Sequence, residues 1–356
     1  EFSTRTTLQI YFVKIPLQAA EIWSFLLLIQ DCSSHICSPM LEQAHDHSHT
    51  PNKAMPDVAR DVGHELTGPL DWVGMEQIEM PVMVVSDGRS FLTPAKINAF
   101  VSLNDTNARG IHMSRLFLLL QDHLENHKLS FTELNHLLQA FVKSHTGLSN
   151  SSRISVKYEL MVKRLALKSD TAGWRSYPVE MDARSIDGKL QFTLGTEVLY
   201  SSTCPCSAAL ARQLIQQKFR EDFPQATLSK EQILAWLGSP QGIVATPHSQ
   251  RSSASVRVAV KNDFAPIDLI NLLEERLKTP VQAAVKRPDE QEFALLNGQN
   301  PLFCEDAARR LRDLLENSLQ FTDYWIKVEH QESLHPHNAV STVCKGIENG
   351  FTNNSF

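Results

Sequence analysis

Residues 154–162 read Ile-Ser-Val-Lys-Tyr-Glu-Leu-Met-Val, in which apolar side chains occupy every second position. Because successive side chains of a strand point to opposite faces, this alternation predicts a β-strand with one buried face. Upstream, residues 130–133 (Ser-Phe-Thr-Glu) form a capping box, and apolar residues follow at helical spacing over 134–141. That pattern predicts a helix with one buried stripe. A helix beside an alternating strand indicates an α+β fold.

The same succession of elements is predicted twice along the chain. In the first half, strands at 75–85 and 96–103, around a turn at Ser86-Asp87-Gly88, precede helices at 114–126 and from 130, and strands at 154–162 and about 175–183. In the second half, strands at 190–200 and 256–260 precede helices at about 266–278 and 304–318, and strands follow from 324 and at 338–344. Two copies of ββααββ predict two similar antiparallel modules with helices on one face, and not a Rossmann sheet. Unpaired edges of such sheets favour oligomerisation, with sites between subunits.

Composition excludes several classes of function. The 356 residues include 34 Lys and Arg against 40 Asp and Glu, so the net charge of −6 argues against a nucleic-acid partner. The dense apolar run at 22–29 is too short to span a bilayer, so we expect no membrane partner. Six cysteines are too few for a disulfide scaffold and favour a reducing, cytoplasmic location. The sequence signatures of P-loop, dinucleotide-binding, zincin and α/β-hydrolase proteins do not occur.

The amino end is predicted to lie outside the fold. Residues 1 to about 39 read as a leader or upstream-translated material, with a secretory signal peptide as the alternative. His45, His47 and His49 alternate in a polar tail that either binds Zn or Ni or is simply solvated. The expected division is therefore 1–54 leader and tail, 55–188 first module, 189–346 second module with a helical insertion at about 207–245, and 347–356 tail.

The segment Ser-Thr-Cys-Pro-Cys-Ser at 202–207 is the most informative for chemistry, because it lies at a predicted strand-to-helix junction. The amino end of a helix stabilises a thiolate, which can then ligate a metal or attack an electrophile. A strained disulfide between Cys204 and Cys206, or an inert pair, is the alternative.

Other groups of the same chemical type follow along the chain. A thiolate, an imidazole and a carboxylate make a three-ligand catalytic site for Zn, Mn or Fe with an open position for water. Each group also has an ordinary structural interpretation; Glu305, for example, opens a helix and would interact with its dipole. These candidates are His248, Glu290, Glu305, Glu332 and His335.

A second candidate segment is Gly-Ile-His-Met-Ser-Arg at 110–115. It places an imidazole (His112) and a guanidinium (Arg115) at a helix start, a geometry suited to phosphate. The alternative is an ordinary N-cap by Ser114 with an incidental arginine.

Six motifs in this order resemble the type IB GTP cyclohydrolases, the metal-dependent enzymes of the first step of folate synthesis. They are G-I-H-M-S-R, S-T-C-P-C-S, H-S-Q-R-S, K-R-P-D-E, N-P-L-F-C-E-D and E-S-L-H-P-H, and the resemblance covers about residues 55–345. It implies the tunnelling fold, with two ββααββ modules per subunit, and a homotetramer with active sites at its interfaces. The insertion between Cys206 and His248 is longer than the family pattern leads us to expect.

The resemblance also implies roles for individual positions. Glu332 matches the glutamate that anchors the amino and ring N–H groups of the purine or pterin, and Arg251 is a candidate for the triphosphate. The matched positions are Cys204, Glu290 and His248 for the metal; Cys204, His248, Glu305 and His335 for catalysis; and Glu332, His112, Arg115 and Arg251 for the substrate.

The implied reaction converts GTP to 7,8-dihydroneopterin triphosphate and formate. Water must add at C8 of the purine, and a divalent metal (Zn, Mn or Fe) lowers the pKa of water from about 15.7 to about 7 to supply that nucleophile. A histidine then moves protons as formate leaves. Two alternatives stay open: a non-catalytic metal-binding or metal-sensing protein, and another tunnelling-fold enzyme of pterins or purines.

Overall fold

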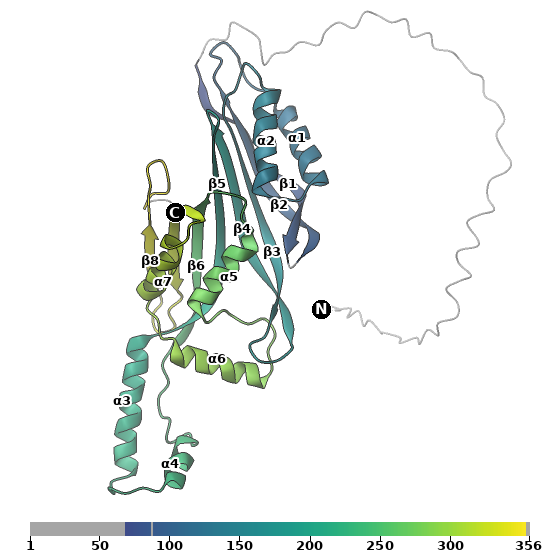
Figure 1. Ribbon diagram of the computed structural model, residues 1–356. Helices are drawn as coiled ribbons and strands as arrows, with labels where there is room; N and C mark the ends of the chain where they lie inside the picture. Colours follow the sequence, from purple (N-terminus) through teal and green to yellow (C-terminus); the bar gives the residue numbers. More distant parts are fainter. Residues whose placement is uncertain (1–67, 87, 354–356) are drawn as a thin grey trace, which may run out of the picture. The chain divides into compact units, whose positions relative to one another are not determined.

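The computed structural model describes residues 68–86 and 88–353. The expectations for the leader, for His45, His47 and His49 and for Asp87 of the first turn lie outside these residues. In the described part of the chain, eight strands form one antiparallel sheet in which each strand pairs with the next, from β1 to β8 (Figure 1). Helices α1, α2, α5 and α7 pack against this sheet.

The first six elements follow the predicted order of strand, strand, helix, helix, strand, strand. The strands are longer than their apolar alternation, because ladder pairing continues through polar ends. The bounds are β1 (Leu70–Ser86), β2 (Arg89–Leu103), α1 (Met113–Asn126), α2 (Phe131–Ser144), β3 (Ser152–Leu165) and β4 (Ala172–Ile186).

The second half repeats this order with additional helices. It contains β5 (Lys189–Thr203), α3 (Pro205–Asp222), α4 (Lys230–Leu237), β6 (Ser249–Val260), α5 (Pro266–Leu277), α6 (Arg287–Gln299), α7 (Cys304–Glu316), β7 (Phe321–His330) and β8 (Ala339–Cys344). The α+β class and the two ββααββ modules of the tunnelling fold are confirmed. Helix α6 was not predicted, because Asp289 is its one fully buried residue and it carries no apolar stripe.

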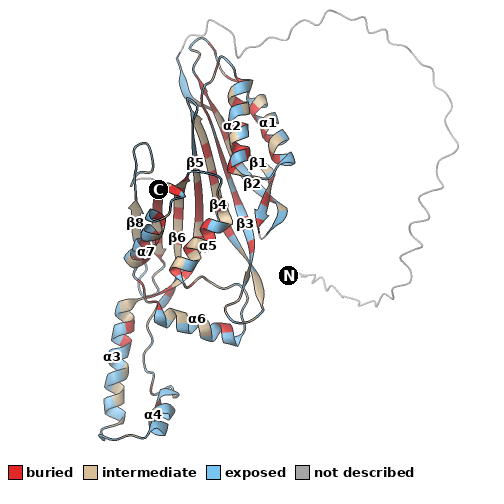
Figure 2. Cartoon of the chain, in the orientation of Figure 1, coloured by how far each residue is buried: buried red, intermediate tan, exposed pale blue. Residues whose placement is uncertain are grey.

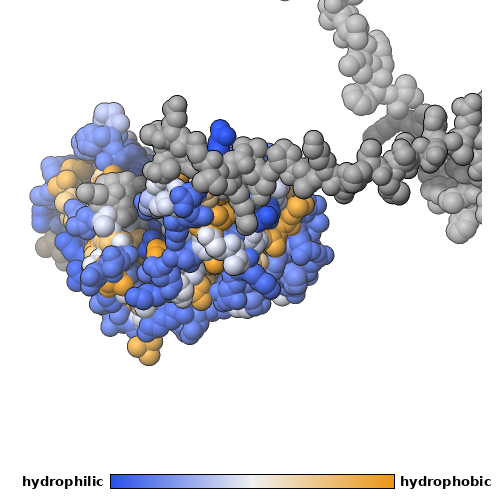
Figure 3. Space-filling view, turned by 90° about the horizontal axis from the view of Figure 1, so that it is seen from above, coloured by the Kyte–Doolittle hydropathy of each residue, from blue (hydrophilic) through white to orange (hydrophobic). Residues whose placement is uncertain are grey.

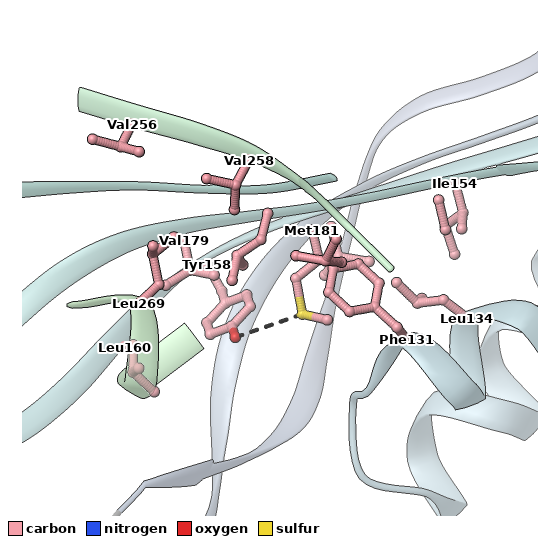
Figure 4. Close-up of a cluster of buried hydrophobic side chains, with 14 of the residues drawn as sticks. Phe131, Leu134, Ile154, Tyr158, Leu160, Val179, Met181, Val256, Val258 and Leu269 are labelled. Atoms are coloured by element: carbon pink, nitrogen blue, oxygen red, sulfur yellow. Dashed lines mark hydrogen bonds between the residues drawn. The ribbon is translucent and has the colours of Figure 1, made fainter. Parts of the chain in front are cut away.

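The core lies between the sheet and the helices and runs through both modules. Figure 4 shows Phe131 and Leu134 of α2 beside Tyr158 of β3, with Val258 of β6 and Leu269 of α5 in the same cluster. All five side chains are buried, and the inward-facing positions of the strands form red bands in Figure 2. The alternation read at 154–162 is therefore the buried face of β3.

The amino end of α2 departs from the predicted capping box. The Ser130 hydroxyl accepts a hydrogen bond from the Glu133 backbone N–H at 3.1 Å, as expected. In a capping box the Glu133 carboxylate would also accept from the Ser130 N–H. Here the Glu133 carboxylate contacts Nδ1 of His123 at 2.5 Å. Asp263, from the turn after β6, accepts from the N–H of the next residue, Phe131, at 3.1 Å. The reciprocal half of the box is lost to this competing imidazole.

The surface is mostly polar. Helices α3 and α4 project from one end of the sheet and are largely exposed (Figures 1 and 2). In the view from above, hydrophilic residues dominate and apolar ones form small patches (Figure 3). Among the described residues, no helix is long and apolar enough to cross a membrane.

Leu137 of α2 tests the continuous core. Its side chain is fully buried, so Leu137→Ala should lower the free energy of unfolding by about 2–5 kcal/mol through lost burial and a residual cavity. Leu118 of α1, which is 63% exposed, is the matched control, and Leu118→Ala should change stability little. Urea denaturation measures both. Equal effects of the two substitutions would contradict this packing.

Candidate functional site

The candidate site forms where β5 ends, β6 begins and β7 ends. Because neighbouring strands of an antiparallel sheet run in opposite directions, these three points lie at the same end of the sheet. Thr203 pairs with Ser249, and Ser252 pairs with His330. The residues just beyond these pairs are Cys204, His248 and Glu332, so strand register brings three of the predicted site residues to one place.

Cys204 is the N-cap of α3, and Pro205 occupies the first turn of that helix. The backbone N–H of Cys204 donates to the carbonyl of His248 at 3.3 Å. Cys204 is a half-buried free thiol and Cys206 an exposed one, so the alternative of a disulfide between them is not what the structure contains. The thiol at the helix start is thus available as a ligand or nucleophile.

His248 belongs to a hydrogen-bonded chain of side chains. Its Nδ1 lies 2.9 Å from Oε1 of Gln250, and Nε2 of Gln250 donates to Oε1 of Glu332 at 3.4 Å. Since Oε1 of Gln250 can only accept, Nδ1 of His248 is the donor in this contact, and Nε2 is the ring nitrogen that could bind a ligand. Glu332 Oε2 is 4.0 Å from the same Nδ1. This arrangement orients the imidazole as the outer partners of metal-bound histidines do.

A buried polar network lies directly beneath these residues. His330 of β7 is within hydrogen-bonding distance of the Tyr200 hydroxyl (2.8 Å) and the Ser202 hydroxyl (3.2 Å) of β5, and Ser202 meets Ser252 of β6 at 2.8 Å. Burial lowers the pKa of His330 to about 4 and raises the pKa of Tyr200. A neutral imidazole and a protonated phenol therefore tie the three strands together.

Glu305 lies in the first turn of α7. Leu302 donates its N–H to the Thr203 carbonyl at 3.0 Å, which brings the start of α7 beside the end of β5. The Cys304 thiol donates to Glu305 Oε2 at 3.3 Å. The N–H of Glu305 itself and then this thiol lower the pKa of the Glu305 carboxyl. Its negative charge acts on His330, opposing the effect of burial there.

Three other predicted residues, Glu290, His335 and Arg251, have exposed side chains. Glu290 is exposed in the first turn of α6, whereas its neighbour Asp289 is buried and accepts from the N–H groups of Lys168 and Ser169 at 2.7 and 2.8 Å. The Ser169 hydroxyl is the main cause of the lowered pKa of Asp289. His335 and Arg251 are both exposed, and the ring of His335 stacks on that of His337 with centroids 4.9 Å apart.

His112 and Arg115 lie in the first module. His112 is the N-cap of α1, and the Arg115 guanidinium donates to the Ser144 carbonyl at the end of α2 at 2.7 Å. The neighbouring His145 is buried, with its Nδ1 3.0 Å from the Phe141 carbonyl, and burial is the main cause of its lowered pKa. The predicted phosphate-binding segment thus also joins the two helices, and Ser114 does not cap α1.

Sequence reasoning missed two groups of functional side chains. Gln250 and His330 look like ordinary strand residues, and only the register of β5, β6 and β7 reveals their contacts. The second group is independent of this site: it consists of His123, His127 and Glu133, whose ligand atoms lie within 4.8 Å of one another and could hold a metal ion. Within residues 68–86 and 88–353, Cys204, His248 and Glu290 do not form such a group.

The sheet of two ββααββ modules and the thiol, imidazole and carboxylate at its strand ends define a tunnelling-fold protein with an enzyme-like site. The family model described as "Type I GTP cyclohydrolase folE2" matches residues 55–341, and the chain belongs to this family.

Curated relatives agree with this membership. GTP cyclohydrolase FolE2 of Pseudoalteromonas translucida is 51% identical over 301 residues, which cover 83% of this chain and 99% of the relative. GTP cyclohydrolase FolE2 of Hydrogenovibrio crunogenus is 46% identical over 301 residues, covering 84% of this chain and 96% of the relative. The non-catalytic alternative is not favoured by these matches.

Among solved structures, the chain is similar to uricase from Arthrobacter globiformis, with a TM-score of 0.44 and 8% identity over 82% of this chain and 99% of that one. Urate oxidase from Bacillus sp. TB-90 gives a TM-score of 0.41 and 10% identity, covering 78% of this chain and 99% of that one.

The buried His330 predicts a pH dependence of stability. Its pKa is about 4 in the folded protein against 6.5 for an ordinary histidine, so between these values the unfolded chain binds an extra proton. Stability should therefore fall as the pH is lowered through this window, by about 3 kcal/mol in total. Urea denaturation from pH 7 to pH 4 should show a shallower fall for His330→Gln. If the free energy of unfolding fell equally with pH in the unmutated chain and in His330→Gln, a neutral buried His330 would be contradicted.

Proposed function

We propose that this chain hydrolyses GTP to 7,8-dihydroneopterin triphosphate and formate, the first step of tetrahydrofolate synthesis, at the ends of β5, β6 and β7. The observation that carries the proposal is that Cys204, His248 and Glu332 lie at one end of the sheet, linked by the Cys204–His248 backbone bond and by Gln250, in a member of the type I GTP cyclohydrolase family. Ring opening at C8 requires a ligand for the metal that activates water, a group that carries protons and a group that anchors the purine. Cys204, His248 and Glu332 would supply these in turn.

Glu332 would anchor the purine. A carboxylate can accept two parallel hydrogen bonds, from the exocyclic amino group and the adjacent ring N–H of guanine. The bond from Gln250 to Oε1 holds this carboxylate in place before the substrate arrives. Gln250 therefore acts as a positioning residue for both Glu332 and His248.

Cys204 and His248 would hold the divalent metal. The donor set fits, because Cys204 is a free thiol and His248 has its Nδ1 engaged by Gln250, leaving Nε2 for a ligand. When bound, Zn, Mn or Fe supplies the Lewis acidity that makes water a nucleophile near neutral pH. Glu290 would complete the site in the assembled enzyme. His248, His335 and Glu305 would carry protons as the purine ring opens and formate leaves.

The substrate's triphosphate would bind to Arg251, His112 and Arg115. The last two lie in the other module, at the start of α1, and would serve a site on a neighbouring subunit. Strands β1 and β8 are the edges of the sheet and each pairs on one side only, so pairing between chains would satisfy their free backbone groups. A homotetramer with interfacial sites accounts for both observations.

The domain division and the location belong to the same proposal. The family model begins at residue 55, which supports 1–54 as a leader and tail, followed by modules at 55–188 and 189–346 and a tail at 347–356. The described cysteines, Cys204, Cys206, Cys304 and Cys344, are free thiols, as a cytoplasmic protein would keep them.

Cys204→Ala tests the reaction. We expect it to lower the rate of formate release from GTP by about 100-fold or more and to abolish metal retention at this site. Cys206→Ala is the matched control, because Cys206 is an exposed thiol two residues away, and it should retain both properties. Mass analysis of the product distinguishes the triphosphate from a cyclic phosphate or another pterin. Formate release by Cys204→Ala at the parent rate would refute the proposed role.

A comparison of the full chain with a chain lacking residues 1–54 tests the assembly and the domain division. Both should sediment as tetramers and release formate from GTP at the same rate, since the removed segment lies outside the family match. A fully active monomer would argue against shared sites. Loss of turnover on removing 1–54 would instead show that the leader and tail belong to the functional unit.

A further inference from the structure

Four side chains gather where α1 ends and α2 begins, away from the site described above. We call His123, His127, Glu133 and His136 the imidazole cluster. Nδ1 of His123 lies 2.5 Å from Glu133 Oε1, and Nδ1 of His127 lies 3.7 Å from the same oxygen. Nδ1 of His136 lies 3.5 Å from Glu133 Oε2. Three imidazoles thus surround both oxygens of one carboxylate.

Glu133 is the buried member of the imidazole cluster. It is 8% exposed, and its ion-pair partners among the described residues are the three histidines, with no lysine or arginine. Removing a carboxylate from water is costly unless hydrogen bonds and a compensating charge replace the solvent. The imidazole rings bring three nitrogen-bearing side chains to both oxygens of this carboxylate. Nitrogen and carboxylate oxygen atoms gathered in this way are the ligands that a transition-metal ion takes.

We propose that the imidazole cluster binds one divalent transition-metal ion of the zinc type. Three imidazole nitrogens and one carboxylate oxygen make a four-donor set, which is the closed coordination of a structural zinc site. Imidazole ligands favour Zn, Co, Ni or Cu over the oxygen-preferring Mg and Ca. The ligand atoms of His123, His127 and Glu133 already lie within 4.8 Å of one another.

Helical spacing places these donors. His123 and His127 are four residues apart at the end of α1, and Glu133 and His136 are three apart in the first turns of α2, so each pair projects from one side of its helix. His127 Nδ1 also lies 3.1 Å from the His123 carbonyl, a hydrogen bond that holds its ring beside the carboxylate. Binding an ion would exchange this bond for a ligand bond.

The ion would cross-link helices α1 and α2. It would join the end of α1 to the start of α2 across the connection formed by residues 127–130. The start of α2 is itself fixed to the second module, because Asp263 accepts from the Phe131 N–H at 3.1 Å. Metal binding at the imidazole cluster should therefore stabilise the folded chain by mass action. This role needs no turnover of GTP, and it does not rest on the proposed function.

Cobalt binding tests the proposal with the full chain. The parent protein carries His45→Asn, His47→Asn, His49→Asn and Cys204→Ala, which remove the alternating histidines near the amino end and the thiol of the candidate active site. After chelation, titration with Co²⁺ should give about one tetrahedral ion per chain, without the absorption that thiolate ligands produce. Co²⁺ and Zn²⁺ should each raise the thermal midpoint of this protein.

His127→Asn combined with His136→Asn is the decisive variant. Both side chains are more than half exposed, at 57% and 56%, so the fold should be retained. Because loss of an outer partner alone weakens metal sites about 10–100-fold, loss of two ligands should weaken Co²⁺ binding at least about tenfold and abolish the thermal shift. Glu125→Gln, an exposed carboxylate on α1, is the control and should bind as the parent does.

Two outcomes would overturn the proposal. The first is a parent protein that binds no Co²⁺ tightly and shows no thermal shift. The second is Co²⁺ binding that His127→Asn with His136→Asn leaves unchanged, which would place the ion elsewhere. Formate release from GTP by the unmutated chain is a separate measurement, so failure here and failure of the proposed function are distinguishable.

Discussion

The antiparallel pairing of β5, β6 and β7 is the constraint on which the candidate site depends. Cys204, His248 and Glu332 are far apart in sequence, yet each lies within two residues of a strand end, and the ladder fixes which strand ends are neighbours. Within the sheet, next to these strand ends, the buried contacts of His330 with Tyr200 and Ser202 stabilise that register. Slippage by one residue would turn the inward-facing side chains outward and separate the chemistry-bearing groups. Sheet register and active-site geometry are therefore one property of this chain.

Much of this architecture could be read from the sequence, because it depends on periodicity. Alternation at 154–162 identified β3, and the repeated order of elements predicted two modules. Helix α6 escaped prediction because a helix that buries little besides Asp289 has no apolar period to detect. The two acidic residues in its first turn, Asp289 and Glu290, also look equivalent in sequence. Only the fold distinguishes Asp289, which anchors the connection between β3 and β4, from the exposed Glu290.

The candidate site was predictable to a different degree. Ordered motifs pointed to Cys204, His248 and Glu332, and the structure brings them together. The contacts of Gln250 and His330 depend on which strands are neighbours, which no local pattern states. His123, His127, Glu133 and His136 were overlooked for a related reason. Their spacing within each helix is ordinary, and their meeting depends on how α1 and α2 pack.

The insertion that carries α3 and α4 starts immediately after Cys204 and returns at His248. Because a backbone hydrogen bond joins Cys204 to His248, the insertion is a closed loop whose two ends meet at the candidate site. Loop-closure entropy grows slowly, so doubling the length of such a loop costs only about 0.6 kcal/mol. Evolution can therefore lengthen, shorten or replace this arm while the thiol and the imidazole keep their separation. The arm is a place where relatives can diverge in partners or control without altering the chemistry at its base.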